Sequence, residues 1–168
     1  MNEPSGNTAV AELFDAHSRV LLLYARQWVG MAGAEDVVQR VFVRLVSSGR
    51  LPAEPGTWLF RCVRNEAISY RRSENRRSRR EQAVASDAMG WFVTHPGDRL
   101  DAGNAQAALE TLSPDQREVI LLRLWSGLTL SEIAGVTEVA VSTVHARYEA
   151  ALATLRQKLE NPCRNRKT

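Results

Sequence analysis

The sequence predicts an all-α protein made of two small helical domains joined by a flexible linker. Apolar residues recur at three- and four-residue steps through most of the chain, and neither half shows the alternation of a β-strand. Between residues 81 and 103 this periodicity stops, and Gly90 and Pro96 appear among acidic residues. We therefore place one helical domain at 8–80, a linker at 81–103 and a second helical domain at 104–160.

Charge is concentrated in one part of the chain. The formal net charge of the 168 residues is only +3, but residues 61–80 hold eight arginines against two glutamates, a local charge of +6. A basic segment of this density favours a polyanionic partner such as nucleic acid.

Several classes of protein are disfavoured by composition. Cys62 and Cys163 lie far apart with no metal-ligand spacing, which argues against a disulfide framework or a metal site. The longest purely apolar run, 20–25, is too short to cross a membrane, and no secretory signal is recognisable. We expect a cytoplasmic protein that needs no metal or other cofactor.

The first domain begins with two amphipathic helices. One runs from about Thr8 and stops at Gly30, and the next begins around 34–36, where acidic residues suit a helix N-terminus. The second helix buries Val38, Val41, Phe42, Leu45 and Val46. Its opposite side carries Asp36, Gln39, Arg40 and Arg44, which form either a solvated face or an interface.

A third helix follows a loop at 47–56 and is capped by Thr57. Its apolar stripe is interleaved with aromatic residues and arginines. Aromatic rings stack on unpaired bases and guanidinium groups hold phosphates, so the pattern suits single-stranded DNA. It suits equally a packed core with a solubilising surface. The candidate contacts are Trp58, Arg61, Arg64, Asn65, Arg71 and Arg72.

The second domain reads as a helix-turn-helix. Ser113 and Thr129 each open a capping box, and the first of these helices ends near Trp125. After a short turn, a longer helix covers 141–159. Such a pair places its second helix in a DNA major groove, although many similar pairs occur in bundles that never touch DNA. The outward residues at the start of the last helix include Ser142, Thr143, His145 and Arg147.

With these residues in place, the chain resembles the extracytoplasmic-function (ECF) sigma factors of bacterial RNA polymerase over about residues 10–160. The shared motifs are specific in their order and spacing rather than singly. In the first domain they are Ala34 to Gln39 with Val41-Phe42, and Trp58 to Arg61 with Asn65 and Ala67. In the second they are Leu112-Ser113-Pro114 with Arg117, Glu132-Ile133-Ala134, Ser142-Thr143-Val144, Arg147 and Leu155-Arg156.

The resemblance implies a bipartite promoter reader. The face of Asp36, Gln39, Arg40 and Arg44 would dock on core RNA polymerase. The helix from Trp58 would read the minus-ten element and capture bases of the separated strand. The helix from Val141 would enter the major groove of the minus-thirty-five element. An anti-sigma factor is a further expected partner, and the protein would associate with the nucleoid when bound to polymerase.

Several residues depart from the family pattern, among them Ala140 and Val141, which replace a better helix cap. Arg40 stands where an acidic residue is usual, and His145 stands where a lysine is common. Glu138 occupies the turn position often taken by glycine, which requires it to adopt a positive φ or the turn to change shape.

Two other functions compete with this one. A stand-alone helix-turn-helix regulator binding duplex DNA shares the second domain, but the first is basic and has no ligand-pocket signature. An enzyme is disfavoured because the chain has no phosphate-binding glycine loop, metal-ligand cluster or nucleophile elbow.

Overall fold

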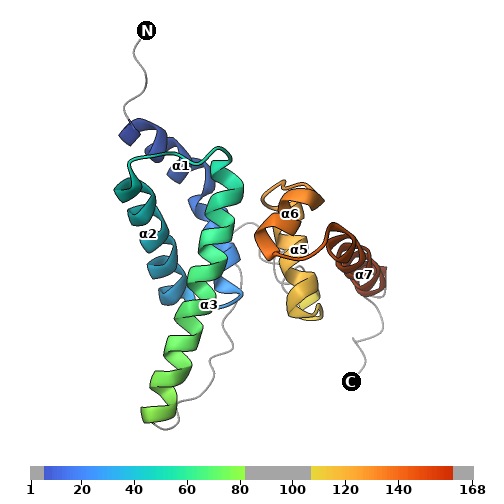
Figure 1. The fold of residues 1–168 in the computed structure, drawn as a ribbon. Coiled ribbons are helices and arrows are strands. Elements are labelled where there is room, and N and C mark those ends of the chain that lie inside the picture. Colours follow the sequence, from blue (N-terminus) through green and yellow to red (C-terminus); the bar gives the residue numbers. More distant parts are fainter. Residues whose placement is uncertain (1–5, 82–106, 161–168) are drawn as a thin grey trace, which may run out of the picture. The chain divides into compact units, whose positions relative to one another are not determined.

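The computed structural model describes residues 6–81 and 107–160, with side chains for 8–77 and 107–158. Every regular element in these ranges is a helix, which confirms the all-α prediction. The chain divides into two compact units, one built on α1 to α3 and the other on α5 to α7 (Figure 1). The predicted linker lies outside the described residues, except for Glu81, the last residue of α3.

The first unit is a three-helix bundle of α1 (Gly6–Arg26), α2 (Met31–Ser48) and α3 (Pro55–Glu81). Each helix packs against the other two, and their apolar stripes meet in one core. The C-terminal part of α3 projects beyond the other two helices (Figure 1). The core residues include Leu21, Tyr24, Val37, Val41, Leu59, Phe60 and Val63.

The helix ends in this unit differ from those predicted. α1 ends at Arg26 rather than Gly30, and α2 begins already at Met31. α3 begins at Pro55, before the predicted cap Thr57, because proline is well tolerated in the first turn of a helix. The predicted loop at 47–56 is therefore shorter. It begins at Gly49, whose left-handed φ of 62° ends α2.

The second unit contains a helical turn at 107–110 followed by α5 (Pro114–Leu124), α6 (Leu130–Thr137) and α7 (Val141–Glu160). Both predicted capping boxes are present. The Ser113 hydroxyl accepts from the Gln116 amide at 3.3 Å, and that of Thr129 accepts from the Glu132 amide at 3.2 Å. These caps fix the ends of α5 and α6 and so set the geometry of the helix-turn-helix.

The turn between α6 and α7 passes through Glu138, whose φ is 59° and ψ 38°. Its N–H donates to the Ala134 carbonyl at 2.9 Å and closes α6. Of the two alternatives expected at this position, a positive φ or a changed turn, the chain adopts the positive φ. A side chain in the left-handed region costs about 1–2 kcal/mol, which glycine would avoid.

Candidate functional site

The outer face of α2 carries the four side chains predicted to dock on polymerase. The carboxylate of Asp36 accepts from Arg40 across one helical turn at 2.7 Å, and 40% and 55% of these two side chains are exposed. Asp36 raises the pKa of the Arg40 guanidinium, with a smaller contribution from Glu66. Gln39 is exposed beside them. Arg40, the departure from the family pattern, is therefore fixed by neighbouring carboxylates.

Glu66 on α3 joins this face to the next helix. Its Oε2 accepts from Arg44 at 2.9 Å, and its Oε1 lies 3.5 Å from a nitrogen of Arg40. Only 16% of the Glu66 side chain is exposed, so the carboxylate is partly shielded from water. The contact links α2 to α3. Sequence reasoning missed it, although the four-residue spacing of Arg40 and Arg44 places both on one side of α2.

The predicted DNA contacts on α3 fall on two faces. On a helix of 3.6 residues per turn, one group lies within an arc of roughly 60° around the helix axis: Trp58, Arg61, Asn65 and Arg72. The other two residues, Arg64 and Arg71, lie within about 20° of each other. The second pair is displaced from the first group by roughly 100°. The first face, opposite the core, carries Trp58, Arg61, Asn65 and Arg72, with all but Trp58 exposed. The second carries Arg64 and Arg71, beside the end of α1.

The second face of α3 meets an aromatic ring. The Cζ atoms of Arg64 and Arg71 lie 5.8 and 5.5 Å from the ring centroid of Trp28, within cation–π distance. Trp28 follows α1, and its N–H donates to the Ala25 carbonyl at 3.0 Å. The first helix predicted from the sequence, from about Thr8 to Gly30, includes Trp28. The contact with arginines far along the chain had no sequence signal.

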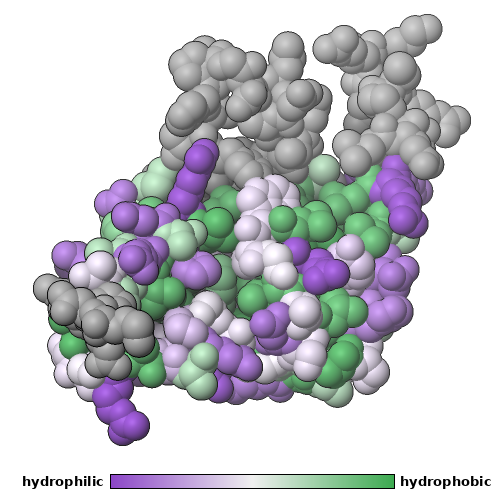
Figure 2. Space-filling model, turned by 90° about the horizontal axis from the view of Figure 1, so that it is seen from above, coloured by the Kyte–Doolittle hydropathy of each residue, from purple (hydrophilic) through white to green (hydrophobic). Residues whose placement is uncertain are grey.

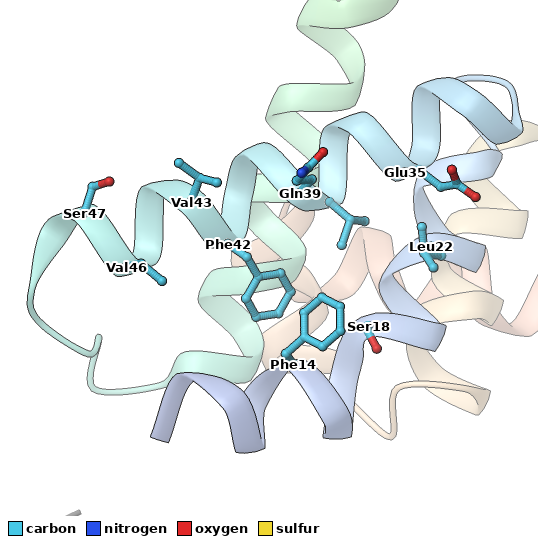
Figure 3. Close-up of a pocket in the computed structure, with 10 residues that line it drawn as sticks. Phe14, Ser18, Leu22, Glu35, Gln39, Phe42, Val43, Val46 and Ser47 are labelled. Carbon is cyan, nitrogen blue, oxygen red and sulfur yellow. The ribbon is translucent and has the colours of Figure 1, made fainter. Parts of the chain in front are cut away.

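An apolar cavity of about 570 Å³ opens between α1 and α2 (Figure 3). The rings of Phe14 and Phe42 meet edge to face in it with centroids 5.0 Å apart. Phe14, Val43 and Val46 are 46%, 58% and 52% exposed. The prediction that Val46 is buried is wrong, because it borders this cavity and not the core. Gln39 and Glu35 lie on the polar rim of the cavity.

Apolar residues also reach the surface elsewhere. In Figure 2 hydrophobic residues form several patches between hydrophilic residues on the face in view. In the second unit, Leu124 and Trp125 at the end of α5 are 54% and 39% exposed, and Val141 at the start of α7 is 47% exposed.

The N-terminal half of α7 presents the predicted recognition residues. Ser142, Thr143 and His145 are exposed, and Val144 between them is fully buried against the rest of the unit. Arg147 differs from the other three. Its side chain is only 26% exposed and lies 2.5 Å from the carboxylate of Asp115 on α5. The ion pair fastens α7 to the start of α5.

Arg117 on α5 holds the chain that enters the second unit. Its guanidinium donates to the carbonyl oxygens of Leu109, Glu110 and Leu112 at 2.9, 3.3 and 3.1 Å. These carbonyls lie at the end of the helical turn at 107–110, where no later turn supplies donors. Partial burial lowers the pKa of Arg117. Arg117, which belongs to the same sequence motif as Leu112-Ser113-Pro114, therefore has a structural role: it binds the backbone before α5.

Two family profiles match the chain, one over the first unit and one over the second. Residues 13–77 match the family described as "Sigma-70 region 2", and residues 102–155 match "Sigma-70, region 4". The ECF RNA polymerase sigma factor SigL of Mycobacterium tuberculosis is 31% identical over 159 residues, with 88% of this chain and 87% of SigL covered. The chain belongs to the ECF sigma factors.

Further ECF sigma factors agree with this assignment. The sigma-E factor of Haemophilus influenzae is 29% identical, with 80% of this chain and 78% of that factor covered. The sigma factor RpoE of Bartonella quintana, solved in complex with the anti-sigma factor NepR, superposes with a TM-score of 0.70 at 26% identity, covering 90% of this chain and 96% of RpoE. CnrH, solved with the cytosolic domain of CnrY, gives a TM-score of 0.63 at 25% identity, covering 92% of this chain and 89% of CnrH.

As an ECF sigma factor, the protein directs RNA polymerase to promoters and to the initiation of transcription, and it is not an enzyme. The alternative of a stand-alone helix-turn-helix regulator is excluded, because the first unit is sigma region 2. Within residues 6–81 and 107–160, no helix has the length and apolarity to cross a membrane.

Proposed function

We propose that the sigma factor divides its work between a polymerase-docking face on α2 and two DNA-reading helices, α3 and α7. The domain boundaries that go with this are 8–80 for region 2, 81–103 for the linker and 104–160 for region 4. The observation that carries the proposal is the separation of faces in region 2. Asp36, Gln39, Arg40 and Arg44 lie on α2, whereas Arg61, Asn65 and Arg72 are exposed on the side of α3 opposite the core. The two surfaces can therefore be occupied at once.

Charge reversal on α2 tests the docking face. Asp36→Arg replaces a half-exposed carboxylate and repels Arg40, so it should weaken the affinity of the full-length protein for core polymerase. Asp15→Arg is the matched control, because it makes the same charge change at an exposed position on α1. Binding of labelled sigma factor to core polymerase, followed by anisotropy, compares the two. Equal affinities for both variants would overturn the docking assignment.

The α3 helix supplies the minus-ten contacts in this proposal. The single strand carries closely spaced phosphates, and Arg61, Arg64, Arg71 and Arg72 provide guanidinium donors along two faces of one helix. Asn65, exposed between them, has both a donor and an acceptor for the edge of an extruded base. Trp58, half-buried near the start of α3, offers a ring for stacking.

Salt titration with holoenzyme tests the phosphate contacts. Arg72→Ala should reduce the slope of log affinity against log salt by about 0.7 for each single-strand phosphate that the arginine neutralises in the unmodified protein. Asn65→Ala should instead lower promoter affinity without changing that slope. If the slope for Arg72→Ala equals that of the unmodified protein, Arg72 does not contact a DNA phosphate.

The α7 helix supplies the minus-thirty-five contacts. Ser142, Thr143 and His145 are exposed at its N-terminal end, where a recognition helix meets base edges and phosphates. Arg147 reaches the DNA from the edge of this surface while its partner Asp115 orients it. The set carries little charge. This suits a reader that is held on the promoter by polymerase.

The cavity between α1 and α2 is the proposed binding site for an anti-sigma factor. Exposed apolar groups around a cavity favour a partner that buries them. The relative RpoE was solved in complex with the anti-sigma factor NepR. Because Gln39 belongs to both the rim and the docking face, an occupant of the cavity would compete with core polymerase.

A competition experiment tests this partner. Proteins encoded beside the sigma factor gene are added to labelled sigma factor and core polymerase. Val43→Asp should abolish displacement by the inhibitor, and Leu124→Asp, at a similarly exposed apolar residue at the end of α5 in region 4, should not. Inhibition that survives Val43→Asp unchanged would place the anti-sigma contact elsewhere. We propose that these exchanges occur in the cytoplasm, and on the nucleoid once polymerase is bound.

A further inference from the structure

The end of α1 presents one aromatic ring to two arginines of α3. Trp28 lies within 6 Å of both Arg64 and Arg71, measured from ring centroid to Cζ. These arginines are seven residues apart, close to two helical turns, so their side chains leave α3 in nearly the same direction. They also belong to the most basic stretch of the chain. One ring therefore holds two like charges that would otherwise repel each other.

The ring itself is held firmly. The amides of Trp28 and Val29 both donate to the Ala25 carbonyl, at 3.0 and 3.2 Å, and Val29 is buried. A few residues on, an added Cβ on Gly33 would lie 3.1 Å from the ring of Tyr70, the neighbour of Arg71. The start of α2 is thus packed closely against α3 at Tyr70, next to Arg71.

Trp28 interacts with the arginines through its ring faces. Its Nε1 is buried and meets no acceptor among the described residues. A cation over an aromatic face is attracted by the ring quadrupole, and this contact uses the flat face of the guanidinium. The N–H groups lie in the plane of the guanidinium, and arginine binds phosphate through these in-plane donors.

We propose that Trp28 is a positioning residue for promoter binding, which holds Arg64 and Arg71 extended toward phosphates of the minus-ten region. This rests on the proposed function of α3 as the minus-ten reader. Long side chains lose rotamer freedom when they bind phosphate, and part of that loss is avoided when a ring has ordered them beforehand. The ring contributes to DNA affinity without itself touching DNA.

Two substitutions at Trp28 distinguish the effect of the aromatic face from that of apolar packing. Trp28→Leu keeps an apolar side chain but removes the quadrupole, and Trp28→Phe keeps an aromatic face. The assay is binding of forked minus-ten promoter DNA by holoenzyme. We expect Trp28→Leu to weaken binding about five-fold, the size of a moderate cation–π effect, and Trp28→Phe to lie near the unmodified protein. Affinity for core polymerase checks that both variants are folded and should not change.

A double-mutant cycle decides whether the ring acts through the arginines. In an Arg64→Ala, Arg71→Ala background, Trp28→Leu should cause no further loss of DNA affinity. If it weakens binding five-fold there as well, or if Trp28→Phe is as weak as Trp28→Leu, the positioning role is refuted. If the double arginine variant binds the fork as well as the unmodified protein, the minus-ten assignment of these arginines fails instead.

Discussion

Glu138→Gly should stabilise region 4. Relief of the left-handed conformation at φ 59° is worth about 1–2 kcal/mol, and the extra freedom of glycine in the unfolded chain removes about 0.5–1 kcal/mol of it. The hydrogen bond from residue 138 to the Ala134 carbonyl is made by the backbone and survives. We therefore expect a net gain of roughly 0.5–1 kcal/mol.

Hydrogen exchange of the full-length protein can measure this gain locally. Peptides covering 130–158 report the opening free energy of α6 and α7, whereas peptides from region 2 serve as an internal reference. Glu138→Ala is the control for charge, because it removes the carboxylate and leaves the positive φ in place. It should show no gain in protection.

The opposite change at a similar backbone position tests the same reasoning. Gly127 has a φ of 68°, and a Cβ added there would meet no atom within 4 Å. Gly127→Ala should therefore lose about 1 kcal/mol through backbone strain alone. If Glu138→Gly gave no more protection than Glu138→Ala, strain at the turn would not be the operative effect.

Three more outcomes are expected. Glu66→Gln keeps the shape of the side chain but removes the charge that holds two arginines of α2, and should lower the opening free energy of region 2 by about 1 kcal/mol in hydrogen exchange; unchanged protection would contradict the link. Hydrogen bonds from the hydroxyl and backbone of Thr129 lower the pKa of Glu132, so its contribution is complete above the unfolded pKa and is lost as pH falls through the folded pKa. Glu132→Gln keeps the cap but does not titrate, so region 4 of this variant should lose less stability than that of the unmodified protein below about pH 4.5. Parallel pH profiles of the opening free energy in the two proteins would refute this. Arg147→Ala should weaken holoenzyme binding at the minus-thirty-five element by about 1–3 kcal/mol, while Asp115→Ala, which removes only the orienting partner, should cause a smaller loss, and equal losses would make their ion pair purely structural.

The local features of region 4 were predictable from the sequence. The capping boxes at Ser113 and Thr129 involve residues three apart, and side-chain chemistry dictates such structure directly. The all-α fold likewise follows from apolar periodicity. The predicted starts of α2 and α3 were less accurate than the capping boxes. α2 begins at Met31 and α3 at Pro55, because these starts depend on packing and on the tolerance of proline in the first helical turn.

The contacts between helices were not predictable in the same way. Glu66 reaches the arginines of α2, and Trp28 reaches Arg64, across separations that periodicity does not encode. Val46 fits an apolar stripe as well as its buried neighbours do, yet it borders an open cavity. A stripe specifies which side of a helix is apolar. It does not specify how far a neighbouring helix extends to cover it.

The link from Glu66 to α2 limits how promoter specificity can be exchanged between sigma factors. A transplanted α3 brings its own residue at this position, and the recipient keeps its own arginines on α2. Chimaeras that swap only the DNA-reading helix would therefore leave unmatched charges beside the polymerase-docking face. Grafts that carry Arg40 and Arg44 together with α3 should retain polymerase affinity better than grafts of α3 alone.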